Sequence, residues 1–331
     1  MYQGLANVGN TCSINTLVQC LGHCPIFLDY ILEQSISVHK RNQQTFCMYD
    51  ELKELLRQMW KENNSLVPQR FLKALYESLG ELYIPGEQFD FTEIWMQLLN
   101  ILIEETHSLE HKAIHQTIKT YRDPTLPYLQ GLSHKSWSTF FQRTNSPLND
   151  IFFGTQIQQI QCTSCNKTYH NVEPLSFLYI DVEEGMEKGM DKLLSSETIE
   201  GWKCDECKHP QGNRVVRFWK LPRIWVLILK RFNQNKKLSQ PIHILPEFHV
   251  GRDVEFSSMS DTDNTSELIH YDLKAIANHY GSLHGGHYNA VCKNKEDWCL
   301  YDDLSIQRIS SIEPILQNNK NAYALFYERR N

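Results

Sequence analysis

The segment GLANVGNTCSINTLVQCLG, residues 4–22, predicts more about this chain than any other part of it. After Cys12, apolar residues recur at helical spacing, with Asn10 or Thr11 as the N-cap and Gly22 as the stop. We therefore expect Cys12 at the N-terminus of a helix. Backbone N–H groups and the positive end of the helix dipole favour a thiolate there, which predicts a pKa below the free value of ~8.5.

A small, buried packing residue is the ordinary alternative for a lone cysteine, but the residues before Cys12 favour catalysis. Gly4 and Gly9 permit close approach of the backbone, and the amide of Asn7 could donate a hydrogen bond to a developing oxyanion. A thiol nucleophile also needs a general base, and that base needs a third group to hold its tautomer.

Position singles out His287 among the fourteen histidines. It follows Gly285 and Gly286 in a predicted strand, and a turn around residues 294–296 returns the chain into the strand Trp298 to Asp302. The second strand ends in acidic residues, so the hairpin can present a carboxylate to the imidazole.

The register of this hairpin narrows the choice of carboxylate. If Lys293 opposes Asp297, His287 faces position 303, and a shift by one places it against 302 or 304. Asp302 or Asp303 is then the natural orienter of the imidazole. The alternative is an acidic pair that merely ends a strand.

Two CxxC pairs predict a metal site: Cys162 with Cys165, and Cys204 with Cys207. Each pair can occupy two corners of a tetrahedron, and four thiolates leave no open position for catalysis. Redox pairing is the alternative, but strands flank both pairs and favour a zinc ribbon. We therefore expect one structural Zn²⁺ ion.

Composition limits the partners and the compartment. With 331 residues, 41% of them hydrophobic, the chain can bury a sizeable core, and its formal net charge of −6 includes no basic block for nucleic acid. It shows no signal segment and no apolar stretch of ~18 residues, so we expect neither secretion nor a membrane span. Ten cysteines in this length favour a reducing, intracellular compartment.

The expected elements change in type along the chain. The first third reads as helices with two further apolar faces, Leu52, Leu55, Leu56, Met59 and Trp60, and Ile94, Trp95, Leu98, Leu99 and Leu102. From about Ile151 strands are predicted at Phe153–Ile160, Leu175–Val182, Arg214–Phe218 and Trp225–Phe232, with residues 224–229 as a covered central strand. Mobile surface loops are expected at Ser133–Asn149 and Glu255–Glu267. One α+β catalytic unit fits this order.

Two motifs resemble one known family. The string from Gly4 to Cys12, continued by Asn15 to Gln19, resembles the cysteine box of the ubiquitin-specific proteases, which are papain-like deubiquitinases. Residues 279–288, followed by Tyr301 to Asp303, are similar to the histidine box of the same family. The family commonly places an aromatic residue after the nucleophile, where this chain has Ser13.

The resemblance implies a papain-like cysteine protease fold in a single catalytic domain, residues 1–331. Its helical thumb would span about 1–150, the zinc-binding fingers with part of the palm about 151–245, and the palm about 246–331. By this resemblance Cys12 is the nucleophile, His287 the base and Asp302 the third member of the triad, with Asp303 as second choice. The side-chain amide of Asn7 would stabilise the oxyanion.

Residues that resemble the family's substrate contacts lie before and within the third helix. A QxDxxE pattern, whose acids lie near the arginine-containing tail of ubiquitin in the family, matches Gln88, Asp90 and Glu93. Helix N-terminal acids are also common dipole partners, which is the alternative. Gly285 and Gly286 would line a narrow channel that admits glycine.

The function implied is hydrolysis of the peptide or isopeptide bond after the C-terminal Gly-Gly of ubiquitin. The expected partners are ubiquitin and ubiquitinated proteins, with no nucleic acid and no membrane, and the expected state is a monomer in the cytoplasm or nucleus. Two alternatives stay open: a catalytically silent scaffold that binds ubiquitin, and a protease for another ubiquitin-like modifier.

Overall fold

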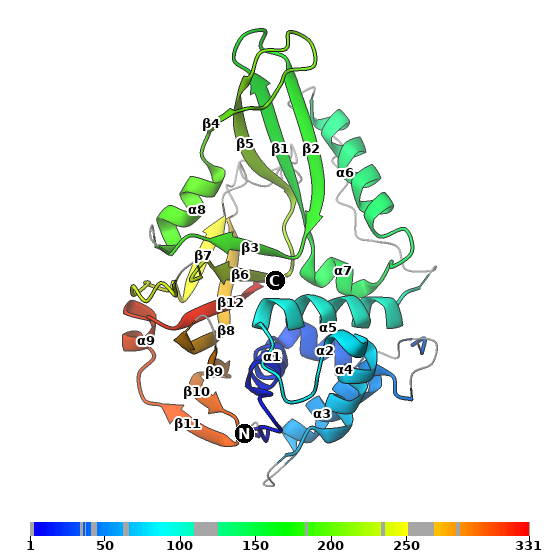
Figure 1. Ribbon diagram of the computed structural model, residues 1–331, viewed down its shortest axis with the longest axis vertical. Helices are drawn as coiled ribbons and strands as arrows, with labels where there is room; N and C mark the ends of the chain where they lie inside the picture. Colours follow the sequence, from blue (N-terminus) through cyan, green and yellow to red (C-terminus); the bar gives the residue numbers. More distant parts are fainter. Residues whose placement is uncertain are drawn as a thin grey trace.

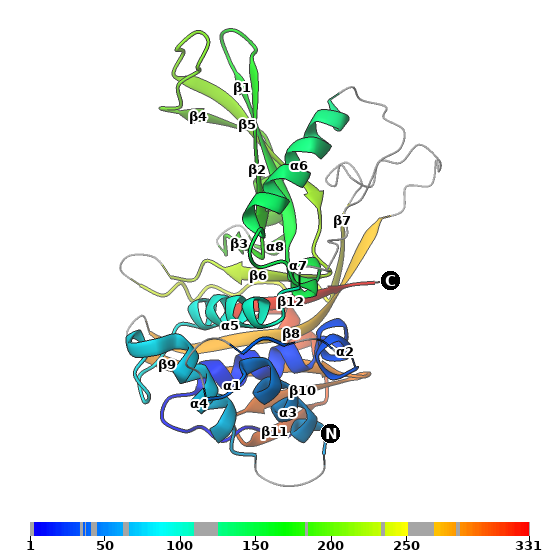
Figure 2. The ribbon, with the colours of Figure 1, turned by 90° about the vertical axis from the view of Figure 1, so that its right-hand side faces the viewer.

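Three parts make up the structure: a group of helices, a large sheet beside them, and a second sheet that projects away from both (Figures 1 and 2). The computed structural model describes residues 3–330 apart from 34–35, 37, 41–44, 62–65, 109–124, 183–184, 233–235, 251–267 and 283–284. The mixture of helix and sheet confirms the predicted α+β class. Among the helices in these ranges, none is long and apolar enough to cross a membrane.

The helical group is formed by the N-terminal part of the chain, coloured blue to cyan in Figure 1. Its elements are α1 Cys12–Gly22, α2 Pro25–Glu33, α3 Met48–Trp60, α4 Gln69–Leu79, the 3-10 turn η1 Gly80–Leu82, and α5 Phe91–Glu105. Every residue of α1 is buried, because the helix packs between α5 and the large sheet. The apolar face predicted for α5 is buried as well. Trp60 departs from prediction: it lies at the last position of α3 and is 43% exposed.

The large sheet has the strand order β11-β10-β9-β8-β12-β6-β3, and β7 pairs with β8. Its strands are β3 Phe177–Ile180, β6 Ile224–Leu229, β7 Glu247–Val250, β8 Ile269–Ser282, β9 Gly285–Asn294, β10 Asp297–Asp302, β11 Ser305–Ile309 and β12 Ala322–Arg329. The short helix α9 Glu313–Gln317 connects the last two of these strands. All of β6 is buried between its neighbours, which confirms the predicted covered strand.

The projecting sheet carries both CxxC pairs in the turns at its far end, at the top of Figure 1. Its order is β2-β1-β5-β4, with β1 Gly154–Cys162, β2 Thr168–Leu175, β4 Glu197–Glu200 and β5 Gln211–Lys220. Helix α6 Leu126–Phe140 packs along β2, α7 Pro147–Phe152 leads into β1, and α8 Met186–Leu194 packs on β5. At the base of the sheet, Lys220 is 2.5 Å from Asp150 of α7 and lies 4.2 Å from the ring centre of Trp137.

The two predicted loops have different outcomes. The prediction for Ser133–Asn149 is wrong, because α6 continues to Phe140 and α7 begins at Pro147. Buried aromatic contacts between Trp137 and Phe141 stabilise this region, although its polar residues suggest a loop. The other predicted loop, Glu255–Glu267, lies outside the described residues.

Candidate active site

The thiol of Cys12 lies at the first residue of α1, as predicted. Thr11 is the N-cap, but its hydroxyl accepts from the N–H of Val8 and makes no capping bond to the helix. Burial raises the pKa of Cys12; the backbone N–H of Tyr288 opposes this effect and the charge of Asp303 adds to it. The expectation of a lowered pKa is therefore wrong for the free chain. The side chain is only 4% exposed, and desolvation of a thiolate outweighs the influence of the helix N-terminus.

The hairpin that carries His287 forms, but the assumed register is wrong by one position. Lys293 opposes Trp298 rather than Asp297. The ladder between β9 and β10 ends at Tyr301, before it reaches His287. The acidic residues that follow Tyr301 can therefore meet the imidazole only through their side chains.

His287 and Asp302 form a hydrogen bond. Nε2 of His287 lies 2.5 Å from Oδ1 of Asp302, and both side chains are 40% exposed. Because Nε2 is used by the carboxylate, Nδ1 is the ring nitrogen that can serve the thiol. Cys12 meets the same strand at the backbone N–H of Tyr288, the residue after His287. The structure thus brings His287 of β9 and Asp302 of β10 into contact and places Cys12 beside β9.

Asp303 has other partners. Its Oδ2 accepts from Nδ2 of Asn7 and its Oδ1 from Nδ2 of Asn15, both at 2.9 Å. Its backbone is left-handed, with φ at 50°, and its carbonyl accepts from the N–H of Leu5 at 2.9 Å. A Cβ on Gly4 would lie 2.5 Å from that carbonyl oxygen, which excludes any other residue there. Asp303 therefore fastens the segment before the nucleophile to the turn after β10.

The amide of Asn7 is held at both ends. Nδ2 donates to Asp303, and Oδ1 accepts from the N–H of Thr11 at 3.0 Å. The residue is exposed, and Nδ2 has a second hydrogen that can donate to an oxygen bound near Cys12. Asn15, which the sequence reasoning missed as a functional residue, contacts Asp303 across 288 positions. No local pattern marks such a contact.

Gln88 and Gly286, both predicted to bind substrate, are bonded to each other. Nε2 of Gln88 donates to the carbonyl of Gly286 at 2.8 Å, and Oε1 accepts from its N–H at 3.2 Å. A Cβ on Gly286 would overlap the carbonyl oxygen of Tyr280, and one on Gly285 would lie 3.4 Å from Oε1 of Gln88. Glycine is therefore required at position 286, whereas position 285 has room for a Cβ.

The two acids at the start of α5 differ in their surroundings. Oδ1 of Asp90 caps the helix by accepting from the N–H groups of Thr92 and Glu93, at 2.8 and 3.2 Å, and its Oδ2 accepts from the hydroxyl of Tyr323 at 3.0 Å. Glu93 is exposed and accepts from the hydroxyl of Tyr83 at 2.7 Å. Glu93 and Tyr83 also line a pocket of about 550 Å³. The carboxylate of Asp90 thus caps the N-terminus of α5, whereas the carboxylate of Glu93 lines a pocket.

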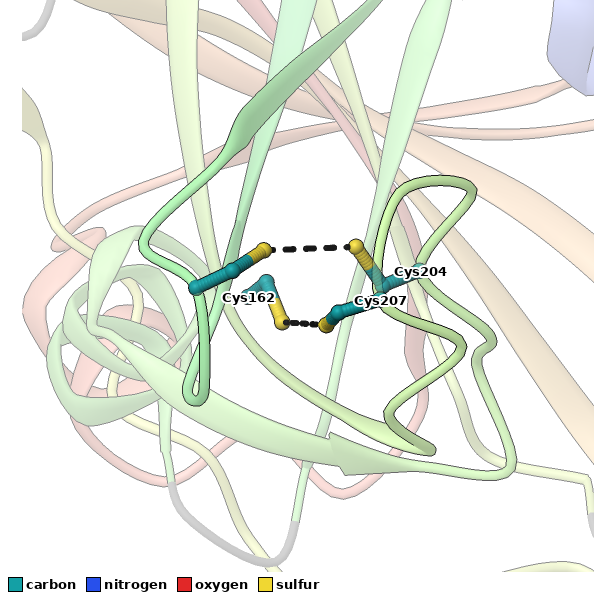
Figure 3. Close-up of side chains that lie close together, drawn as sticks. Cys162, Cys204 and Cys207 are labelled. Atoms are coloured by element: carbon teal, nitrogen blue, oxygen red, sulfur yellow. Dashed lines mark hydrogen bonds between the residues drawn. The ribbon is translucent and has the colours of Figure 1, made fainter.

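The four cysteines of the CxxC pairs converge (Figure 3). The sulfur of Cys162 lies 3.6 Å from that of Cys207, and the sulfur of Cys165 lies 3.6 Å from that of Cys204. All four sulfurs lie within 4.8 Å of one another. A tetrahedral zinc ion with Zn–S bonds of ~2.3 Å requires sulfurs ~3.8 Å apart, so this donor set fits the ion.

The two turns that carry these cysteines share one backbone form. Asn166 and Lys208, each directly after the second cysteine of a pair, have φ values of 57° and 62°. Their N–H groups bond back to the carbonyls of Cys162 and Cys204 at 3.1 and 2.9 Å. Tyr169, another residue the sequence reasoning missed, places its hydroxyl 3.4 Å from Sγ of Cys204. This contact is the largest of the causes, together with backbone N–H groups of the turn, that lower the pKa of the Cys204 thiol to about 6. The site can therefore hold a metal ion through preformed turns.

Known proteins resemble this chain along almost its whole length. The sequence profile of the family described as ubiquitin carboxyl-terminal hydrolase matches residues 3–327. Ubiquitin carboxyl-terminal hydrolase Usp2 of Drosophila melanogaster is 28% identical over 98% of this chain, and ubiquitin carboxyl-terminal hydrolase 2 of Homo sapiens is 25% identical over 98%. The chain spans 34% and 54% of those two proteins, but 90% of ubiquitin carboxyl-terminal hydrolase 12 of Salmo salar, which is 26% identical over 99% of this chain.

Solved structures share the fold. A chain of the SAGA DUB module Ubp8/Sgf11/Sus1/Sgf73 bound to monoubiquitin has a TM-score of 0.73 at 22% identity and covers 99% of this chain and 69% of its own. The module bound to ubiquitin aldehyde also gives 0.73, at 23% identity, over 99% of this chain and 70% of its own. Both descriptions name several proteins in one module, so the expectation of a monomer finds no support in them.

These matches confirm the predicted fold class, with the helical group, the large sheet and the projecting sheet corresponding to thumb, palm and fingers. The boundaries near residues 150 and 245 stay a prediction. The resemblance seen in the cysteine and histidine boxes is confirmed as well: the chain belongs to the ubiquitin carboxyl-terminal hydrolase family.

Proposed function

We propose that this protein is a cysteine-type deubiquitinase that hydrolyses the bond after the C-terminal Gly-Gly of ubiquitin. Membership of the family supports the reaction class. The single observation that carries the proposal is the hydrogen bond between His287 and Asp302 on the strand that also meets the thiol of Cys12. This contact supports the assignment of Cys12 as nucleophile, His287 as base and Asp302 as the orienting acid.

Catalysis begins with proton transfer. Nδ1 of His287 takes the proton of the Cys12 thiol, while Asp302 holds the imidazolium through Nε2. The thiolate then attacks the carbonyl carbon of the last glycine. Because the pKa of Cys12 is raised in the free chain, the thiolate forms when bound substrate brings thiol and imidazole together.

The oxyanion that forms is stabilised by Asn7. Its second Nδ2 hydrogen donates to the oxyanion together with backbone N–H groups at the start of α1, and one such donor contributes ~3 kcal/mol. Asp303 and Thr11 hold the amide in place. The imidazolium then protonates the leaving amine, and water activated by His287 hydrolyses the thioester, which releases ubiquitin and restores the thiol.

The tail of ubiquitin is recognised by charge and by shape. Glu93, at its pocket, is the acid that receives an arginine of the tail, and Asp90 supports it by capping α5. Gly285 and Gly286 would border the channel for the tail, and at Gly286 the carbonyl of Tyr280 leaves no room for a side chain. An incoming glycine pair fits such a channel, because a Cβ would collide with its sides.

The projecting sheet would hold one structural Zn²⁺ through the thiolates of Cys162, Cys165, Cys204 and Cys207. When bound, the ion would link the two turns and fix the tip of the sheet, which grips the body of ubiquitin. All the described cysteines are free thiols, which fits an intracellular compartment, either the cytoplasm or the nucleus.

An activity-based probe tests the proposal. Ubiquitin-vinyl sulfone should label the wild-type protein and not the Cys12→Ala variant. A folded wild-type protein that binds ubiquitin without being labelled would establish the silent scaffold instead. Initial rates on fluorogenic conjugates of ubiquitin and of other modifiers with Gly-Gly ends would separate ubiquitin from its relatives.

A further inference from the structure

Part of β9 has an edge that no strand covers in the described part of the chain. Strand β8 pairs with β9 along its length, from Cys292 to Gly285. Strand β10 pairs with β9 only from Asn294 to Ala290. Residues 286–289, which include the base His287, are therefore paired on one side only.

The backbone groups on this open edge have partners that are not strands. In an antiparallel strand, N–H and C=O groups point to alternate sides at successive residues, so residues two apart point the same way. The N–H of Tyr288 meets the sulfur of Cys12, and both backbone groups of Gly286 meet the side chain of Gln88. Gly286 and Tyr288 thus present one edge that ends at the nucleophile.

The carboxamide of Gln88 makes the two hydrogen bonds that one residue of an added antiparallel strand would make with its own N–H and C=O groups. It donates to the carbonyl of Gly286 at 2.8 Å and accepts from its N–H at 3.2 Å. A peptide that binds by strand addition uses this pair of bonds on an exposed edge. Gly285 and Gly286 carry no side chains that could shield the edge. The carboxamide of Gln88 therefore stands where the backbone N–H and C=O of one residue of an extended ligand would lie.

A second contact keeps Gln88 in this position. Nδ2 of Asn10 donates to the carbonyl of Gly86 at 2.7 Å, and a Cβ on Gly9 would lie 3.5 Å from Cα of Gly86. The loop before α5 is thus attached to the loop before Cys12 through Gly86 and to β9 through Gln88. It crosses from the element that carries the nucleophile to the element that carries the base.

We propose that Gln88 is a self-inhibitory plug: its carboxamide closes the open edge of β9 in the free chain, and the tail of the substrate must displace it to pair with Gly286. The identity of that tail as the end of ubiquitin rests on the proposed function, whereas the plug itself does not. Both bonds of Gln88 are neutral and exposed, and the N–H and C=O of one ligand residue replace them one for one, so the exchange is reversible. The apparent dissociation constant equals the intrinsic one divided by the fraction of molecules in which the edge is open.

Binding of ubiquitin tests the plug without turnover. In a Cys12→Ala background, Gln88→Ala and the similarly long Gln88→Met should each bind fluorescent ubiquitin about three- to tenfold more tightly by anisotropy, since an edge closed in nine molecules of ten weakens binding about tenfold. Gln317→Ala is the matched control, because it removes an amide of the same type whose partner is Glu313 on α9. Its affinity should equal that of the background protein.

A second measurement needs no ubiquitin. With Cys12 present, Gln88→Ala should raise the rate of Cys12 alkylation by iodoacetamide about three- to tenfold, read by mass spectrometry of its peptide, and Gln317→Ala should leave it unchanged. Weaker ubiquitin binding by the Gln88 variants would overturn the plug and make Gln88 a substrate contact. Unchanged alkylation would overturn it too. Faster alkylation in a protein that binds no ubiquitin would support the plug and refute the proposed substrate.

Discussion

The adjacent carboxylates Asp302 and Asp303 have separable roles that mutation can distinguish. Asp302→Ala removes the 2.5 Å bond to Nε2 of His287. A hydrogen bond to a charged partner contributes ~1.5–3 kcal/mol, and each ~1.4 kcal/mol changes a rate tenfold. Both side chains are 40% exposed, so screening by water keeps the effect toward the lower value, and kcat should fall about 10- to 30-fold. The melting temperature should change little, because water can replace the lost carboxylate.

Asp303→Ala should lower both activity and stability. It removes the acceptor of the Asn15 amide, which is 3% exposed, and that of the Asn7 amide. The buried Asn15 amide then keeps only its longer bonds to the carbonyls of Leu5 and Ala6, at 3.3 and 3.2 Å, so the free energy of unfolding should fall by ~1 kcal/mol. A displaced Asn7 loses up to ~3 kcal/mol of oxyanion stabilisation, or about 100-fold in kcat. Asp303→Asn keeps one acceptor oxygen and should show a smaller loss of both quantities.

The assay combines turnover of a fluorogenic ubiquitin substrate with calorimetric melting for each variant. Asp297→Ala is the control, because its partner Arg308 and its own side chain are exposed, and such pairs contribute ~0–1 kcal/mol. A variant Asp302→Ala within twofold of wild type, together with a large loss of kcat but unchanged melting in Asp303→Ala, would refute the assignment. Asp303 would then be the residue that orients the imidazole.

Three further predictions follow from burial and charge. Lys220→Met should lower the free energy of unfolding by ~3–5 kcal/mol, because it removes the ammonium group 2.5 Å from the Asp150 carboxylate, whose side chain is 5% exposed. Adding Asp150→Leu should recover most of the loss, and calorimetry that shows no change for the single variant would contradict this prediction. Cys204→Ser should abolish zinc retention, and Tyr169→Phe should weaken zinc affinity ~10- to 100-fold. Atomic absorption after dialysis against increasing concentrations of chelator measures both effects. Equal zinc content in the wild type and both variants would count against the site. Alkylation of Cys12 in the free protein should rise about tenfold per pH unit from pH 7 to 9, because its raised pKa keeps the thiol protonated there, and a rate that levels off below pH 8 would disprove it.

Local patterns in the sequence are sufficient to predict the main helices and strands and several candidate site residues. The helix that begins at Cys12 follows from apolar spacing, and the covered strand Ile224–Leu229 follows from an uninterrupted apolar run. Each CxxC pair also forms locally, since a turn of that length brings both of its sulfurs to one side. The helix, the strand and each single pair depend on residues within a few positions of one another, so the order of residues determines them, whereas the two pairs, 39 positions apart, meet only because β1 pairs with β5.

Contacts between distant segments determine the burial of the helices and the partners of the site residues. Spacing shows that one face of α1 is apolar, but not that every side of it is covered, and this burial is what reverses the expected pKa shift of Cys12. The sequence leaves Asp302 and Asp303 equivalent, whereas packing gives the first to His287 and the second to two asparagine amides. The bond between Gln88 and the backbone 198 positions away has no local signal at all. Such contacts depend on which elements meet in three dimensions, and that is set by the packing of the whole core.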